Sequence, residues 1–163
     1  MTTHPFDILT LENGAQLIFT PCPGTKAVNL EDAISTLKNA GTHILISLMF
    51  DAEMEENSVL SLPGECVKQD IQWLQFPILD DAVPNEIFEA QWQANKAHIL
   101  ETLDNKGSVA VHCKGGTGRT GLVIALILLA LGWSSEKVIA EVQKIRPKAL
   151  QNKAQLSYFN SYK

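Results

Sequence analysis

The stretch His112-Cys113-Lys114-Gly115-Gly116-Thr117-Gly118-Arg119-Thr120-Gly121 joins a strand pattern to a helix pattern. Residues 108–112 are typical of a strand, and the unbroken apolar run 122–131 predicts a buried helix that begins near Arg119. The glycines between them let the backbone curl until successive N–H groups point inward, and a helix N-terminus adds positive potential. This turn is therefore predicted to bind a phosphate group.

Two side chains of the turn can act on a bound phosphate. Arg119 can offer a planar fork of donors to two phosphate oxygens. The positive field at the helix N-terminus favours Cys113 as a thiolate, which is its nucleophilic form. Taken singly, a cysteine at a strand end is often a small core residue and a glycine-rich turn is often only a turn. Together with Thr120 at this spacing they predict cysteine-based catalysis.

Outward from this turn, strand and helix patterns alternate along the chain. Strands are expected at 6–11, 15–20, 43–49, 71–78 and 108–112, and helices at 30–37, from 51, at 63–69, 85–103, 119–131, 135–146 and 150–162. This alternation predicts an α/β fold with a central, mostly parallel sheet flanked by helices, whose ligands collect at the carboxyl ends of the strands. Because no repeat or linker interrupts the pattern, we expect residues 1–163 to form a single domain.

The composition narrows the class of partner. The formal net charge of −5 argues against nucleic acid or an anionic membrane. The longest apolar run has ten residues, about half of the roughly 20 needed to span a bilayer. No secretory signal precedes Thr10, and Cys22, Cys66 and Cys113 lack metal-ligand spacing, which favours a reducing cytoplasm. We expect a cytoplasmic monomer without metal or cofactor.

The turn resembles the Cys-x5-Arg-Ser/Thr signature of the protein tyrosine phosphatase superfamily, including the preceding His112. The tail Ala149-Leu150-Gln151-Asn152-Lys153-Ala154-Gln155-Leu156-Ser157-Tyr158-Phe159 resembles the dual-specificity branch, especially the kinase-associated phosphatases. The resemblance spans about 42–159 and implies a metal-independent reaction in two steps, thiolate attack that gives a phosphocysteine and then hydrolysis.

The resemblance also implies a role for each residue of the turn. Cys113 is the nucleophile, Arg119 clamps the transition state and Thr120 donates its hydroxyl to the departing sulfur. His112 holds the loop and tunes the thiol. The backbone N–H groups from Lys114 to Arg119 complete the phosphate cradle, which adds Gly115, Gly116, Thr117 and Gly118 to the predicted binding residues.

A general acid should protonate the leaving oxygen, which accelerates such reactions by roughly 10²- to 10⁴-fold. The segment Phe76-Pro77-Ile78-Leu79-Asp80-Asp81 resembles the acid loop of the family, whose Pro-Ile-x-Asp pattern selects Asp80. Asp81 is the alternative, although it is better explained as a cap of the turn. Gln155 and, more weakly, Gln151 resemble glutamines that position the hydrolytic water in related enzymes. The alternative for both is a solvated helix face.

The predicted substrate is phosphotyrosine in proteins, with phosphoserine and phosphothreonine as further candidates. Lys114 also occurs in lipid-directed relatives of the tensin type, so a phosphoinositide or inositol phosphate phosphatase is the alternative. Those enzymes carry a second basic residue where this chain has Thr117. A phosphoprotein-binding module with vestigial activity is the third reading.

Two further sets of residues have ordinary structural explanations. Cys66 is either a buried thiol or a protective disulfide partner of Cys113. Trp73, Trp92 and Trp133 lie in strand or helix patterns and are predicted to be core residues.

Overall fold

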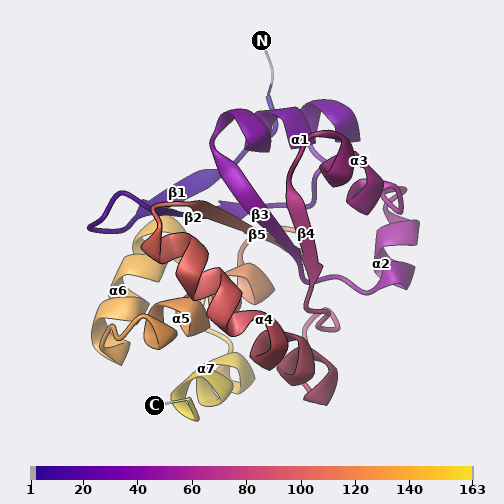
Figure 1. Cartoon of the computed structure of the whole chain (residues 1–163). Coiled ribbons are helices and arrows are strands. Elements are labelled where there is room, and N and C mark those ends of the chain that lie inside the picture. Colours follow the sequence, from indigo (N-terminus) through magenta and orange to yellow (C-terminus); the bar gives the residue numbers. More distant parts are fainter. Residues whose placement is uncertain (1–2, 163) are drawn as a thin grey trace.

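A five-stranded sheet forms the centre of the part of the chain that the structure describes, with helices on both of its faces (Figure 1). The structure is a computed structural model that describes residues 3–162. Met1 and Thr2, which belong to the segment predicted to contain no secretory signal, lie outside the described residues. The strands are β1 (Asp7–Thr10), β2 (Gln16–Thr20), β3 (Thr42–Ser47), β4 (Gln72–Gln75) and β5 (Ser108–His112), in the order β1-β2-β5-β3-β4. Only β1 runs antiparallel to its neighbour, which confirms the mostly parallel α/β fold.

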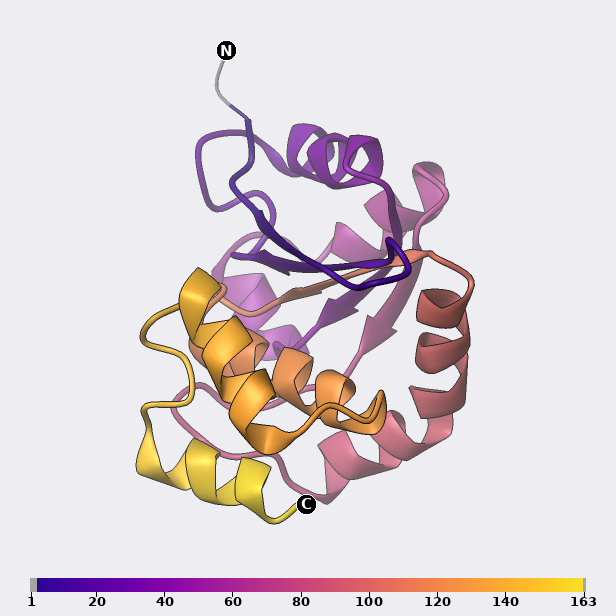
Figure 2. The same cartoon turned by 90° about the vertical axis from the view of Figure 1, so that its left-hand side faces the viewer.

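The helices divide between the two faces. They are α1 (Leu30–Asn39), α2 (Asp51–Glu56), α3 (Leu62–Lys68), α4 (Glu86–Asp104), α5 (Gly118–Ala130), α6 (Ser135–Ile145) and α7 (Lys153–Asn160). In both views α1 lies on one side of the sheet, and α4, α5, α6 and α7 lie on the other (Figures 1 and 2). Because both faces are covered, β5 is buried throughout and β3 at every position except His43, as the continuous apolar run 44–46 predicts for β3.

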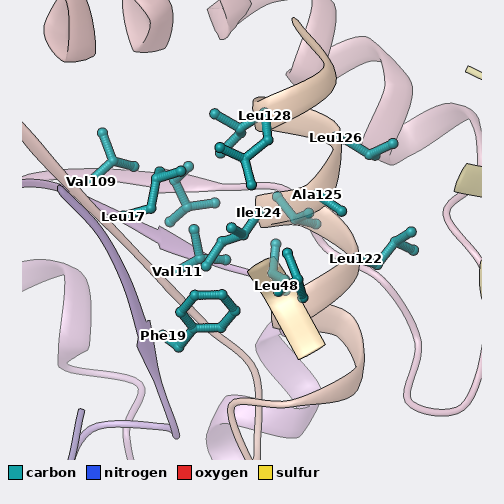
Figure 3. Packing of buried hydrophobic residues seen from close by; sticks show 14 of the residues in the cluster. Leu17, Phe19, Leu48, Val109, Val111, Leu122, Ile124, Ala125, Leu126 and Leu128 are labelled. Carbon is teal, nitrogen blue, oxygen red and sulfur yellow. The ribbon is translucent and has the colours of Figure 1, made fainter. Parts of the chain in front are cut away.

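Alternating strand residues supply two separate cores. Leu17, Phe19, Val109 and Val111 pack against α5, whose side chains Leu122, Ile124, Ala125, Leu126 and Leu128 fill the larger core (Figure 3). Ile18, Leu45 and Ala110 point to the opposite face and pack with residues of α1 and α3. Each fully buried aliphatic side chain contributes roughly 1.5–3 kcal/mol, so α5, buried on every side, is held firmly in the centre.

Several predicted elements are shorter than expected, and β4 and α7 differ most. The strand predicted to reach residue 78 ends at Gln75, although the N–H groups of Phe76 and Ile78 still donate to the carbonyls of Ser47 and Leu48 at 2.9 and 3.0 Å. The last helix begins at Lys153 rather than at 150, because Leu150 adopts a φ of +59° and Asn152 caps the helix by accepting a hydrogen bond from the Gln155 N–H. Gln151 therefore precedes the helix.

Candidate active site

The loop between β5 and α5 curls around the thiol of Cys113. Cys113 follows β5 directly and is buried, with an exposed fraction of 3%. Its Sγ accepts hydrogen bonds from the Gly116 N–H at 3.3 Å and from the Thr120 hydroxyl at 3.2 Å. Gly116 has a φ of +78°, and a Cβ there would lie 2.7 Å from the backbone of Thr20 and Pro21, so only glycine fits. The two donors stabilise negative charge on the sulfur.

Arg119 lies in the first turn of α5, with its guanidinium fixed by Glu53 of α2. Nη1 and Nη2 donate to the two oxygens of Glu53 at 2.7 and 2.8 Å, and Nη1 also donates to the Ile78 carbonyl at 3.0 Å. Burial alone would lower the pKa of Arg119, but the hydrogen bond with Glu53 and the negative charges of Cys113, Glu53 and Asp80 outweigh it and raise that pKa. The guanidinium is therefore a permanent cation.

The remaining donors of Arg119 define where an anion can bind. Of its five N–H groups, these bonds leave, within residues 3–162, the Nε–H and the second Nη2 hydrogen. These two donors share one edge of the planar group, which is the fork that two phosphate oxygens accept from. The Asp80 Oδ1 lies 3.4 Å from Nη2, one of the two nitrogens of this edge.

Most predicted site residues line one pocket of about 260 Å³. The lining comprises Asp80, Asp81, Cys113, Lys114, Gly115, Thr117, Gly118, Arg119 and Gln155. Asp80 is 68% exposed and its Oδ1 accepts a hydrogen bond from the Asp81 N–H. Gln151 does not line this pocket, since its amide donates to the Pro147 carbonyl on the surface.

His112 is fully buried directly beneath the loop. Its Nδ1 lies 3.2 Å from the Cys113 carbonyl oxygen, and its Nε2 lies 2.5 Å from the Ser47 hydroxyl. Burial, opposed by the hydrogen bond to Cys113 and helped by the charges of His4 and Arg119, lowers the pKa of His112 to about 4. The imidazole is therefore neutral near pH 7 and is placed to hold the loop.

The cysteine beside the loop is Cys22. Its N–H donates to the Lys114 carbonyl at 3.1 Å, and burial is the main reason that the pKa of its thiol rises to about 12. Cys66 packs in the core cluster beneath α1 and α3, which does not include Cys113, and burial raises its thiol pKa to about 12 as well. All three cysteines are free thiols.

Two charged residues at the loop were missed from the sequence. Glu53 orients Arg119, and Arg146 donates from Nε to the Gly116 carbonyl at 2.9 Å and from Nη1 to Asp7 at 2.6 Å. Because β3 and β5 are parallel neighbours, an acidic residue just after β3 was a candidate partner for Arg119. Four carboxylates occur in 51–56, however, and their spacing does not distinguish Glu53.

Residues 3–162 contain neither a metal-binding cluster nor a membrane-spanning helix. No group of three or more His, Cys, Asp or Glu side chains in this part of the chain is arranged to hold a metal ion. None of its helices combines the length and the apolar character needed to cross a bilayer.

The tryptophans differ in burial: Trp92 is a core residue, whereas Trp73 and Trp133 are half-buried and pack at the edges of the cores.

Comparison with known proteins shows the family to which the chain belongs. Residues 24–159 match the model described as PTP-SAK, Swiss Army Knife protein, DSP-PTPase phosphatase domain. A protein of Invertebrate iridescent virus 6 that is named as a tyrosine phosphatase is 36% identical over 91 residues, which are 55% of this chain and 33% of that protein. The chain spans a third or less of the first curated relatives that it matches.

Solved structures share the fold. Kinase-associated phosphatase, in a form whose catalytic cysteine is replaced by serine, superimposes with a TM-score of 0.86 at 24% identity, covering 99% of this chain and 94% of that one. The phosphatase PTPMT1 in complex with PI(5)P gives a TM-score of 0.70 at 19% identity, with 90% and 88% covered.

Proposed function

Because the chain belongs to the PTP-SAK family of DSP-PTPase phosphatase domains, we propose that it is a cysteine-dependent, metal-independent phosphatase that hydrolyses phosphotyrosine in proteins. Phosphoserine and phosphothreonine are proposed as further substrates. The observation that carries this proposal is the placement of the Cys113 sulfur, which accepts two hydrogen bonds in a glycine-rich loop and lines the same pocket as Arg119.

The first step transfers the phosphoryl group to the enzyme. The thiolate of Cys113 attacks phosphorus, a sulfur–phosphorus bond forms, and the bond to the leaving oxygen breaks. Arg119 and the loop N–H groups stabilise the charge on the other three oxygens, where preorganised donors act most strongly. Asp80, exposed at the pocket rim, gives its proton to the leaving oxygen.

The second step frees the enzyme. A water positioned by Gln155 loses a proton to the Asp80 carboxylate and attacks phosphorus, so that the sulfur–phosphorus bond breaks and inorganic phosphate leaves. The Thr120 hydroxyl, 3.2 Å from the sulfur, stabilises the thiolate as it departs. His112 takes no proton in either step, because its pKa of about 4 keeps it neutral.

The charges at the pocket favour a substrate with one phosphate. Lys114 and Arg119 are the cations of the lining, and Lys114 is held by the Asn57 side-chain oxygen at 2.5 Å. Asp80 and Asp81 line the same pocket and would repel additional phosphates. A phosphoprotein therefore fits better than a polyphosphorylated inositol, whose clustered phosphates need several free cations. We further propose that the protein acts as a cytoplasmic monomer, away from membranes and nucleic acid.

The test is phosphate release in EDTA and a thiol reductant. The substrates are an aryl phosphate, a phosphotyrosine peptide, a phosphothreonine peptide and a phosphoinositide, and Cys113→Ser is the control. We expect release from the peptides that the chelator does not abolish and the variant lacks, with a trapped phosphocysteine after rapid quenching. Faster release from the phosphoinositide would favour the lipid alternative. Tight phosphopeptide binding without turnover in either form would favour the binding module.

A further inference from the structure

A short row of polar side chains crosses the sheet beneath the catalytic loop. Leu45 pairs with Ala110 and with Trp73 in the parallel ladders, and Ser47 pairs with His112. Because side chains alternate between faces, Ser47 and His112 share the face of Leu45, which is otherwise an apolar surface packed against α1 and α3. Ser47 and His112 are both 0% exposed. Buried polar groups on an apolar face need defined hydrogen-bond partners.

Three hydrogen bonds connect this row to the nucleophile. The Trp73 Nε1–H donates to the Ser47 Oγ at 2.8 Å, Ser47 Oγ lies 2.5 Å from His112 Nε2, and His112 Nδ1 lies 3.2 Å from the Cys113 carbonyl oxygen. The chain of bonds therefore runs from β4 through β3 to the end of β5.

The donors fix the direction of this chain. An indole N–H can only donate, so the Ser47 oxygen accepts from Trp73 and keeps its single hydrogen for His112. The Cys113 carbonyl oxygen beside Nδ1 can only accept, so the proton of the neutral imidazole lies on Nδ1, and Nε2 accepts from the Ser47 hydroxyl. Nδ1–H then donates to the Cys113 carbonyl at 3.2 Å.

We propose that Ser47 and Trp73 are positioning residues that fix His112 as its Nδ1–H tautomer and thereby hold the backbone of Cys113 in its catalytic geometry. The proposal rests on the proposed phosphatase function. Without the Ser47 hydroxyl, the buried Nε2 lone pair loses its donor, which removes part of the preference for the Nδ1–H tautomer. In the other tautomer a nitrogen lone pair faces the Cys113 carbonyl oxygen at 3.2 Å. That repulsion displaces the residue that carries the nucleophile.

Trp73 is the member of this series of hydrogen bonds that lies nearest the protein surface. It is half-buried and lines a groove of about 430 Å³ together with Pro77 and Ile87. Replacing it by phenylalanine keeps an aromatic ring in this place and removes the N–H. A purely structural role of Trp73 thus predicts little effect of Trp73→Phe, whereas the positioning role predicts a change at His112.

The test compares Ser47→Ala, Ser47→Thr and Trp73→Phe. Trp133→Phe is the matched control, because Trp133 takes no part in the series of hydrogen bonds from Trp73 to Cys113. Nitrogen-15 NMR of the His112 ring reports the tautomer directly, and steady-state kinetics with an aryl phosphate separate kcat from KM. We expect Nδ1–H in the wild type, in Trp133→Phe and in Ser47→Thr, whose hydroxyl restores the bond. In Ser47→Ala we expect mixed tautomers and a kcat lower by about ten- to a hundredfold, with KM changed by less than about threefold.

Trp73→Phe should show the same signature with a smaller loss in kcat, about three- to tenfold. An unchanged Nδ1–H tautomer in both Ser47→Ala and Trp73→Phe would overturn the proposal, as would a kcat within twofold of the wild type in both. If Ser47→Ala does not fold, Trp73→Phe decides by the same readouts. A wild type without turnover would refute the phosphatase function, while the NMR arm would still decide whether Ser47 and Trp73 fix the imidazole.

Discussion

Glu53→Gln tests whether the orientation of Arg119 limits catalysis. The substitution keeps the size of the side chain, removes its charge and replaces one of the two oxygens that accept from Arg119 at 2.7 and 2.8 Å with an N–H₂ group. Arg119 is only 3% exposed, so water does not easily replace the lost bond. A hydrogen bond to a charged group contributes about 1.5–3 kcal/mol, so we expect kcat/KM to fall about 10- to 150-fold.

The assay is hydrolysis of an aryl phosphate, with thermal unfolding recorded on the same samples. Glu55→Gln is the matched control, because it removes the same charge from an exposed position of the same helix. We expect Glu55→Gln to retain wild-type kcat/KM. Equal activity of Glu53→Gln and Glu55→Gln, with both proteins folded, would refute the argument that the bidentate contact orients the guanidinium.

Three further perturbations give separate outcomes. Asp80→Asn should lower turnover of alkyl phosphates about 10²- to 10⁴-fold and far more than Asp81→Asn, because Asp80 is the carboxylate in contact with Arg119; equal losses in kcat would contradict this. The pKa of His112 is about 4 in the folded protein and 6.5 in the unfolded chain. Below pH 6.5 the unfolded chain therefore binds the proton more readily, so the free energy of unfolding should fall as the pH drops to 4, by about 3 kcal/mol from this residue. Urea unfolding at both ends of that range should show a shallower pH dependence in His112→Asn. Gly116→Ala should destabilise the fold by at least about 1–2 kcal/mol and reduce kcat, because the φ of Gly116 is +78° and a Cβ there would lie 2.7 Å from backbone atoms. Gly64 has open space where a Cβ would lie, so Gly64→Ala should change neither the free energy of unfolding nor kcat in the same assays.

The architecture was predictable because its signals are local. Apolar periodicity located most of the described helices and strands, and Pro63 and the acidic residues from Asp51 indicated two short helices. The glycine-rich turn identified the phosphate loop before any contact was known. The errors also have local causes. The positive φ of Leu150 delays α7, and nothing in an apolar leucine predicts that conformation.

The supports of the loop could not be predicted because they join distant segments. Alternating patterns indicate a parallel sheet without giving its strand order, and the order determines that β3 lies between β5 and β4. The contacts of Glu53 with Arg119 and of Trp73 with Ser47 depend on that order. Trp73 was predicted to be a core residue because it lies in a strand pattern, whereas its indole N–H donates to Ser47 at 2.8 Å.

These supports reach the catalytic loop from both faces of the sheet. Arg146, at the end of α6, holds the Gly116 carbonyl from the α5 side, while His112 contacts the Cys113 carbonyl from the face covered by α1 and α3. Glu53 fixes Arg119 from α2. Because each of these bonds joins two groups of the protein itself, the anion site is preorganised, and the cost of ordering it is met in folding rather than in binding or at the transition state. Loss of any one support should therefore act on kcat more than on folding, since the sheet and its two cores remain intact.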